Sequence, residues 1–465
     1  MKMLINGKWI DTEKKIEVAN PYDNAVIDYV PRAEQSHVDM AIDSASHYDF
    51  SLSSWNRYEI LHNFSELLKE KKDEFSNLIS LESGKSLKES SIEVERASQT
   101  FLISGEEAKR LNGEVLNCDA VRGMPNRHAL VLREPVGIVL AITPFNYPLN
   151  LVAHKVGPAI ASNNPIILKP SSLTPLTALK MAELLINLGI PKRMLHVLTG
   201  NSSEIGDYLV ANPSFKKISF TGSVPVGKSI CQKAGMKRVS MELGSNDPLI
   251  VLNDADIKKA VNCATVGAFG NNGQRCTSIK RIIIENSVAD QFIEAFINRT
   301  KGLKVGDQMV LTTDIGPLIT EKAAKEVENQ VESALNNGAV CLLGGKREGT
   351  LFWPTILDHV TSDNPIVIEE VFGPIAPIIR VEDFEEAITV ANSTNYGLQA
   401  GIFTNRLDKA MEAAKRLQVG GVIINDGPGF RAEHLPFGGL KDSGLGREGV
   451  KYAINEMTQL KTVVL

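Results

Sequence analysis

A cysteine in a polar, turn-forming segment is the first candidate for chemistry in this chain of 465 residues. Cys276 lies in Gly273-Gln274-Arg275-Cys276-Thr277, which lacks the apolar neighbours of a buried structural thiol. Glu242 precedes it by 34 residues, within Met241-Glu242-Leu243-Gly244. A reactive cysteine needs access and a nearby group that favours the thiolate, and a carboxylate can act as base for a thiol or for a water. The spacing alone leaves a second interpretation open, in which Cys276 is an inert core thiol and Glu242 is a surface carboxylate.

The segments before Glu242 alternate between β-rich and helical runs. Val136–Ile142 is a continuous apolar run, which is typical of a strand buried on both faces. A helix is predicted to begin at Thr174-Pro175, because proline fits the first helical position. This alternation indicates a parallel sheet of nucleotide-binding type. Its further strands are expected at Pro165–Leu168, Leu195–Leu198, Lys217–Phe220 and Val239–Glu242.

A second α/β series follows and contains Cys276. It is predicted to include strands at Pro248–Leu252, Arg281–Ile284 and Gly420–Ile424, with a helix at Ala323–Leu335. Helical spacing of apolar residues from Asn56, and helical composition at Arg96–Arg110, predict helices ahead of both series. The charged run Lys69–Lys72 is interpreted as a solvated face.

Size and composition limit the class of protein. The length predicts two or more cores, and the apolar fraction of 43% with 23% charged residues is that of a globular protein. A net charge of −5 with mixed signs gives no basic stripe for nucleic acid and no polybasic membrane patch. The N-terminus has no signal-peptide pattern. Five scattered cysteines without a CxxC pair argue against a disulfide framework and a metal site, and suit a reducing cytoplasm.

The pair of Cys276 and Glu242, at this spacing, resembles the signature of the aldehyde dehydrogenase superfamily. Further blocks of that family follow in family order over nearly the whole chain. They are Pro144–Pro148, Leu168-Lys169-Pro170, Phe220–Ser223, Glu370–Pro374, Asn395–Leu398, Pro436–Gly439 and Ser443-Gly444.

The resemblance implies an α/β fold with two parallel-sheet domains and a small β arm. A cofactor-binding domain is expected at 1–112 and 136–246, and a catalytic domain at 247–445. The arm is expected at 113–135 and 451–465, forming a sheet between subunits of a homodimer or homotetramer. The apolar tail would otherwise be an exposed edge, which proteins usually cover.

The resemblance also implies roles in oxidising an aldehyde to an acid. Cys276 would attack the carbonyl to give a thiohemiacetal, while the Asn146 side-chain amide and the Cys276 N–H hold the oxyanion. Glu242 would activate the water that hydrolyses the later thioester, and its apolar neighbours should raise its pKa. Asn146 could instead satisfy its own turn. Relatives that transfer the acyl group to coenzyme A tend to lack a glutamate here, so Glu242 favours hydrolysis.

NAD or NADP is the implied cofactor, although the chain has no G-x-G-x-x-G fingerprint. A helix opening at Val226-Gly227, after Phe220–Ser223, could hold a phosphate at its N-terminus. By resemblance, Lys169 and Ser172 contact the adenosine ribose. Many NAD-preferring relatives carry a glutamate at the position of Ser172, and its charge would repel the 2′-phosphate of NADP. With serine there, this chain should tolerate NADP, or even prefer it. Alternatively, Ser172 only caps the next helix. The other implied cofactor residues are Thr143, Pro144, Phe145, Gly222, Ser223, Leu243, Glu370 and Phe372.

The resemblance places Arg96 and Arg431 at the substrate mouth, near Arg275 beside the nucleophile. These arginines predict a small aldehyde with an anionic tail, because guanidinium pairs with phosphate, phosphonate, sulfonate or carboxylate. Alternatively, Arg96 pairs with Glu93 or Glu95, and Arg275 faces a backbone carbonyl. The resemblance is strongest to the branch acting on lactaldehyde, glyceraldehyde 3-phosphate and phosphonoacetaldehyde. A neutral aldehyde such as lactaldehyde, a coenzyme A-acylating enzyme and a structural protein that kept the fold are the competing hypotheses. The implied substrate residues are Arg96, Tyr147, Arg275, Thr277, Arg431 and His434.

Overall fold

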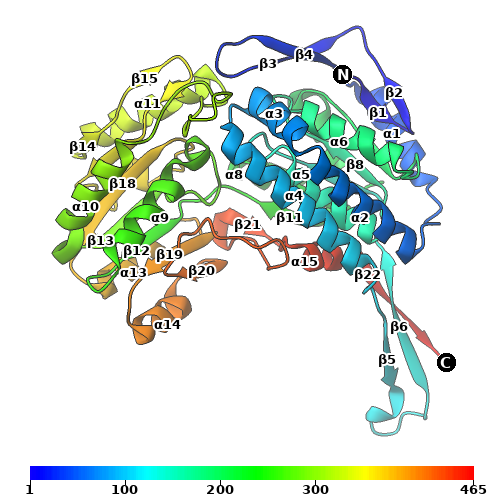
Figure 1. Cartoon of the computed structure of the whole chain (residues 1–465). Coiled ribbons are helices and arrows are strands. Elements are labelled where there is room, and N and C mark those ends of the chain that lie inside the picture. Colours follow the sequence, from blue (N-terminus) through cyan, green and yellow to red (C-terminus); the bar gives the residue numbers. More distant parts are fainter.

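The apolar runs form the centres of two separate sheets in the computed structural model, which describes residues 1–465 (Figure 1). The first sheet has the order β2-β1-β9-β8-β7-β10-β11-β21. Numbered along the chain, its parallel strands β9-β8-β7-β10-β11 follow the order 3-2-1-4-5 of nucleotide-binding sheets. The antiparallel strands β1, β2 and β21 extend its edges. The bounds are β1 (Met3–Ile5), β2 (Lys8–Ile10), β7 (Val139–Ile142), β8 (Ile166–Lys169), β9 (Leu195–Val197), β10 (Lys217–Thr221), β11 (Arg238–Glu242) and β21 (Gly444–Leu445).

Helices cover both faces of this sheet. Val139 and Ala141 belong to one hydrophobic cluster and Leu140 to the other, because successive side chains point to opposite faces. The first face is covered by α2 (Ser54–Glu70), α3 (Lys72–Ser83), α4 (Leu87–Ala108), α5 (Asn150–Ala161), α6 (Leu176–Asn187) and α15 (Val450–Glu456). The second face is covered by α1 (Gln35–Ser46), α7 (Ser202–Ala211) and α8 (Val224–Lys233).

The second sheet forms the other lobe, in the order β14-β17-β18-β13-β12-β19-β20. Its strands are β12 (Pro248–Val251), β13 (Arg281–Glu285), β14 (Val340–Leu343), β17 (Thr355–Asp358), β18 (Ile375–Val381), β19 (Gln399–Phe403) and β20 (Gly421–Ile424), of which only β14 is antiparallel. Its helices are α9 (Ile257–Phe269), α10 (Asn286–Thr300), α11 (Glu321–Asn336), α12 (Pro365–Ile368), α13 (Phe384–Asn392) and α14 (Leu407–Arg416). The short pairs β3 (Lys15–Ala19) with β4 (Val26–Pro31), and β15 (Arg347–Glu348) with β16 (Leu351–Phe352), lie outside both sheets.

A three-stranded antiparallel sheet forms an arm that projects from the first lobe (Figure 1). It contains β5 (Glu114–Asn117), β6 (His128–Pro135) and β22 (Thr458–Val464). Val115, Leu460 and Val464 are more than half exposed on it. Residues 450–456, most of which we assigned to the arm, form α15, which packs against α5 and α4.

Several boundaries differ from those predicted. Helix α6 begins at Leu176 with Pro175 as its N-cap residue, and α8 begins at Val224 rather than Val226. Pro225 does not prevent this, because first-turn N–H groups have no partner within the helix. Helix α2 starts at Ser54, because the Ser53 side chain accepts from the Asn56 N–H. The charged run Lys69–Lys72 marks the junction between α2 and α3. No helix combines the length and apolar character needed to cross a membrane.

Candidate active site

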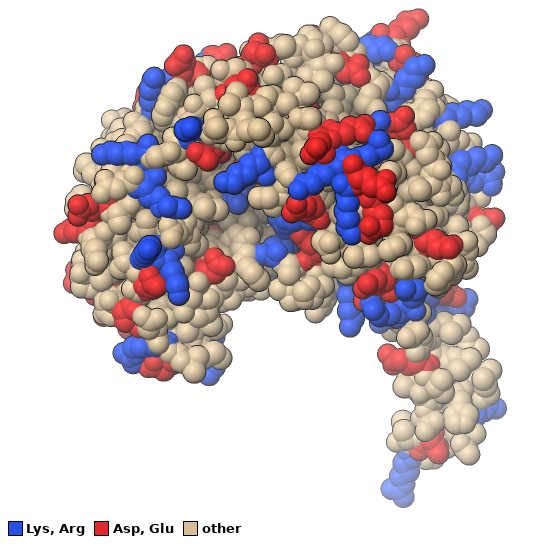
Figure 2. All heavy atoms as spheres, in the orientation of Figure 1, with Lys and Arg blue, Asp and Glu red and all other residues tan.

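A cavity of about 360 Å³ contains most of the predicted site residues. Both lobes contribute residues to its wall. On the molecular surface drawn in Figure 2, acidic and basic side chains are interspersed. The predicted residues that line it are Arg96, Pro144, Phe145, Asn146, Tyr147, Gly222, Ser223, Glu242, Leu243, Arg275, Cys276, Thr277, Glu370, Phe372 and Arg431. Thr143, Lys169, Ser172 and His434 do not line it.

The first sheet positions three of these segments. The strand order reverses between β7 and β10, and ligands of such sheets bind beyond the carboxyl ends of the strands at this point. Asn146 follows β7, and Gly222 with Ser223 follows β10. Glu242 is the last residue of β11. The topology therefore explains why segments far apart in sequence share one cavity.

Cys276 lies in the loop between α9 and β13, and it is partly exposed. Burial raises the pKa of its thiol to about 12, with a further contribution from Asp247. The Cys276 carbonyl accepts from the Ser245 hydroxyl, and no backbone carbonyl accepts from its N–H. The partial exposure of Cys276 agrees with the accessible setting that its polar neighbours in the sequence predicted. Because of its raised pKa, the thiol holds its proton more tightly than a free cysteine does.

Asn146 is 5% exposed and faces the cysteine loop. Its Nδ2 donates to the Gln274 carbonyl at 2.8 Å, whereas its Oδ1 has no partner in the chain. The alternative in which Asn146 satisfies its own turn is therefore wrong, because the amide bonds across to the other lobe.

Glu242 is 3% exposed, and neither of its carboxylate oxygens has a hydrogen-bond partner. Burial, followed by the nearby Glu448 carboxylate, raises the pKa of Glu242 well above 4.5. This confirms the rise in pKa that its apolar neighbours predicted. Glu242 and Cys276 line the same cavity and are close enough for their charges to interact.

Two glycines allow the loop before β18 to approach the site. A Cβ on Gly244 would lie 2.1 Å from Glu370 Oε2, and a Cβ on Gly273 would lie 1.9 Å from the Gly373 carbonyl oxygen. Gly273 also has a φ of +68°, in the left-handed region that favours glycine. Glu370 can therefore accept from the Ser245 N–H at 3.0 Å.

The predicted cofactor side carries polar groups without partners. Lys169 is buried, donates only to the Pro170 carbonyl at 3.4 Å, and has its pKa lowered to about 8 by that burial. The hydroxyls of Thr143 and Thr221 are buried and unpaired. Ser223 is the N-cap residue of α8. An ammonium, two free hydroxyls and a helix N-terminus fit the phosphate and ribose groups of a dinucleotide.

Arg96 pairs with Glu433, at 2.7 Å from Nε to Oε1, and so with neither of the neighbours proposed from the sequence. Glu433 also contacts His154, at 2.6 Å from Nε2 to Oε2. Burial by itself would raise the pKa of Glu433, but His154, Arg96 and Arg431 together lower it. The lowered pKa favours the ionised form of Glu433, which holds Arg96 at the cavity wall.

Arg431 donates from Nη2 to Glu448 Oε2 at 3.1 Å, and its guanidinium carbon lies 3.9 Å from the centroid of the Phe437 ring. Its Nε is buried, makes no hydrogen bond and lies 3.8 Å from Glu433 Oε2. Arg275 donates to the Val266 and Gly267 carbonyls at 2.6 and 3.0 Å, as the alternative interpretation held, while its Nε also lacks a partner.

His434 is exposed and apart from the cavity, unlike the other predicted substrate residues. The sequence analysis did not predict Glu433, Glu448 or His154 as site residues. Only their residue type, an ionisable side chain, could have suggested them. It also left Phe437 unassigned, although that residue lies in the block Pro436–Gly439. The remaining unpredicted lining residues are Asn150, Leu151, Thr221, Gly244 and Gly429.

Comparison with known proteins shows which family the chain belongs to. The profile of the aldehyde dehydrogenase family matches residues 9–463. A 3-sulfolactaldehyde dehydrogenase of Priestia aryabhattai is 44% identical over 464 residues, covering 100% of this chain and 97% of the relative. A lactaldehyde dehydrogenase of Methanocaldococcus jannaschii is 45% identical over 470 residues and 100% of both chains. An NADP-dependent glyceraldehyde-3-phosphate dehydrogenase from Bacillus halodurans C-125, solved with NADP, is 41% identical with a TM-score of 0.98, covering 100% of this chain and 98% of that one. As the sequence predicted, the chain belongs to the aldehyde dehydrogenase family and is an NAD(P)-dependent enzyme that oxidises aldehydes.

Proposed function

We propose that this chain oxidises a small aldehyde with an anionic tail to the free carboxylic acid. The observation that carries the proposal is the position of Arg96 and Arg431 on the wall of the cavity that contains Cys276. Each guanidinium is held by a buried carboxylate, so it is fixed in place before a substrate arrives. The Nε–H groups of Arg275 and Arg431 make no hydrogen bond, although Arg431 Nε lies 3.8 Å from Glu433 Oε2, so each would gain an acceptor from an anionic tail.

Cys276 is the proposed nucleophile. The Cys276 thiol gives up its proton to water, its sulfur bonds to the aldehyde carbon as the C=O π bond opens, and the oxyanion of the resulting thiohemiacetal accepts from the Asn146 amide and the Cys276 N–H. Each preorganised donor of this kind stabilises the transition state by roughly 3 kcal/mol in comparable sites. Loss of a hydride from the same carbon leaves a thioester on Cys276.

Lys169, Ser172, Ser223, Glu370 and Phe372 are the residues proposed to hold NAD or NADP, which when bound supplies the hydride acceptor. Ser172 carries no negative charge to repel a 2′-phosphate, and Lys169 has no carboxylate partner. We therefore propose that the enzyme accepts NADP as well as NAD.

Glu242 is the proposed base for the second half of the reaction. Its carboxylate takes a proton from water, the hydroxide adds to the thioester carbon, and the Cys276 sulfur leaves as the acid forms. The absence of a hydrogen-bond partner on either oxygen leaves both free for that water. A glutamate here also favours hydrolysis over transfer to coenzyme A.

Steady-state kinetics on short aldehydes of matched length would test the anionic preference. We expect kcat/KM to be higher for sulfonate, phosphate, phosphonate or carboxylate tails than for propionaldehyde. Arg96→Ala should lower kcat/KM by about ten- to hundredfold for the anionic aldehydes, and by far less for propionaldehyde. Arg431→Ala is a less selective test, because the charge of Arg431 also lowers the pKa of Glu242. An equal loss for both classes would contradict the anionic pocket and favour a neutral substrate, as the name of the lactaldehyde dehydrogenase relative suggests.

We also propose that the chain forms a homodimer or homotetramer through its arm and works in a reducing cytoplasm. The exposed apolar residues of β5 and β22 support the first proposal, and the five unpaired cysteines support the second.

A further inference from the structure

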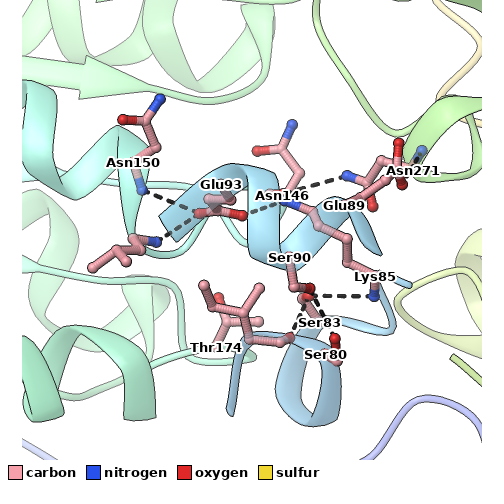
Figure 3. A network of polar contacts seen from close by, with 12 residues as sticks. Ser80, Ser83, Lys85, Glu89, Ser90, Glu93, Asn146, Asn150, Thr174 and Asn271 are labelled. Carbon is pink, nitrogen blue, oxygen red and sulfur yellow. Dashed lines mark hydrogen bonds and ion pairs between the residues drawn. The ribbon is translucent and has the colours of Figure 1, made fainter. Parts of the chain in front are cut away.

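Helix α4 presents three charged residues on one face, and each contacts a different segment of the active site. Glu89, Glu93 and Arg96 are spaced so that they lie on the same side of a helix. Arg96 belongs to the proposed substrate pocket. The two glutamates take no part in the chemistry proposed above, yet Figure 3 shows them on either side of Asn146.

Glu93 holds the segment that follows Asn146. It is fully buried, and its Oε1 accepts from the N–H groups of Leu149 and Asn150 at 2.9 and 3.1 Å (Figure 3). These groups open α5 and have no partner within the helix. The other oxygen pairs with the buried Lys85 ammonium, which also lies 3.6 Å from the centroid of the Tyr147 ring.

Glu89 holds the segment that leads to Cys276. Its Oε2 accepts from the Asn271 N–H at 2.7 Å (Figure 3). Asn271 has a left-handed backbone with φ 48° and ψ 38°, a conformation that non-glycine residues adopt only when their surroundings fix it. The Asn271 side chain donates to the carbonyls of Asn146 and Gln274, each at 3.3 Å. Asn271 therefore bridges the two loops that would form the oxyanion site.

We propose that Glu89 is a positioning residue that sets the separation of these two loops. It holds Asn271, and with it the Cys276 loop, at a fixed distance from the Asn146 segment held by Glu93. One helical turn of about 6 Å separates the two anchors along α4. The proposal rests on the oxyanion role of Asn146 in the proposed function, since Glu89 acts on the reaction through that site.

The first test compares Glu89→Leu with Glu89→Gln and with a control on the same helix. Glu89→Leu should lower kcat by about ten- to hundredfold, because small displacements of reacting groups are costly, and should leave the aldehyde KM, the NADP Kd and the Tm unchanged. Glu89→Gln should restore most of the rate, because its amide oxygen accepts the same N–H. Glu95→Leu, on the exposed side where Glu95 pairs with Lys72, should behave as the wild type. A wild-type kcat in Glu89→Leu would overturn the proposal.

Asn271→Gly and a double-mutant cycle complete the test. Glycine keeps the left-handed backbone and removes the bridging amide, so its loss of kcat should match that of Glu89→Leu. In an Asn146→Ala background, Glu89→Leu should cost little more, because residues that act as a unit are not additive. Additive losses would overturn the positioning role while leaving the proposed function intact. If Asn146→Ala kept the full rate, the oxyanion role of Asn146 would fail, and the role of Glu89 with it.

Discussion

At the scale of single residues, Glu242 combines burial with the lack of any hydrogen-bond donor. Charged neighbours bear on it in opposite directions: Glu448 raises its pKa, while Arg431 and Lys155 lower it. Lys155 bonds to Glu448 at 2.8 Å, so the negative charge that raises the pKa of Glu242 is itself partly compensated. Such a carboxylate takes up a proton at a higher pH than a solvated glutamate does, which suits it to act as a base.

Glu242→Gln should separate the two halves of the reaction. An amide cannot accept the proton of the hydrolytic water, so the thioester should accumulate after the hydride has left. In stopped-flow measurements, about one equivalent of reduced cofactor per active site should appear in a burst, followed by a steady-state rate reduced by about a hundredfold or more. An unchanged steady-state rate would remove Glu242 from the mechanism.

The raised pKa of Glu242 predicts the direction of the pH dependence. The base is active when deprotonated, and its pKa lies above 4.5, so kcat should fall as the pH drops through that raised value. The fall should therefore begin at a higher pH than for an exposed glutamate. A pH profile of kcat for the wild type checks this, and an acid limb close to pH 4.5 would show that the proton acceptor is a solvated carboxylate.

At the scale of elements, the site depends on how closely the loops of the two sheets approach. Gly244→Ala would place a methyl group within the Glu370 carboxylate and displace it. Because Glu370 is proposed to hold the nicotinamide ribose, the KM for NADP should rise by about tenfold or more. Gly206→Ala is the matched control, since its Cβ would meet only Ser202 at 3.7 Å in helix α7. Equal cofactor KM values in both variants would exclude Glu370 from cofactor binding.

The loop between β8 and α6 carries the predicted choice of cofactor. Ser172→Glu should shift the preference from NADP toward NAD, because a carboxylate accepts from both ribose hydroxyls and repels a 2′-phosphate. Hydrogen bonds to a charged group contribute roughly 1.5–3 kcal/mol, so the ratio of kcat/KM for the two cofactors should move by about tenfold or more. If that ratio stays the same, Ser172 takes no part in the choice of cofactor; it does not cap α6 either, because Pro175 is the N-cap residue of that helix.

Local sequence predicted the elements well, because their signals are local. The continuous apolar run at Val139–Ile142 became a strand with a hydrophobic cluster on each face. The pairings across elements had no such signal. Arg96 and Glu433 are 337 positions apart, and the nearer carboxylates proposed for Arg96 bond elsewhere, Glu93 with Lys85 and Glu95 with Lys72.

Residues of the candidate site could be predicted from the sequence mainly where they belong to a recognisable motif. Cys276, Glu242 and Asn146 were found by their motifs, and the structure brings them to one cavity. His434 was included with Arg431 because both lie in the same loop, but an exposed side chain three residues along can point away from the site. The left-handed backbone of Asn271, and the hydrogen bond from its N–H to Glu89, depend on backbone conformation. Residue types alone did not reveal them.

At the scale of the whole molecule, the arm predicts an assembly. Leu460 and Val464 are 61% and 53% exposed on β22. On the face of the arm drawn in Figure 2, uncharged surface lies between a few acidic and basic side chains. Leu460→Asp with Val464→Asp should convert the oligomer to a smaller species in light scattering, because charges would have to be buried between subunits. Leu407→Asp is the control, since Leu407 is 74% exposed on α14 in the other lobe. An unchanged mass in the arm variant would exclude β22 from the interface.

The eighth strand of the first sheet has a consequence for synthesis on the ribosome. Strand β21, at Gly444–Leu445, pairs with β11 beside Glu242, so the last part of the chain completes a sheet begun near its start. Arg431, Glu433 and Glu448 also come from this final stretch. A nascent chain halted before residue 431 would carry Cys276 and Glu242 but neither the closing strand nor these charges. Premature termination between Cys276 and Arg431 should therefore yield inactive protein, and the enzyme should gain activity only after Glu448 has been synthesised.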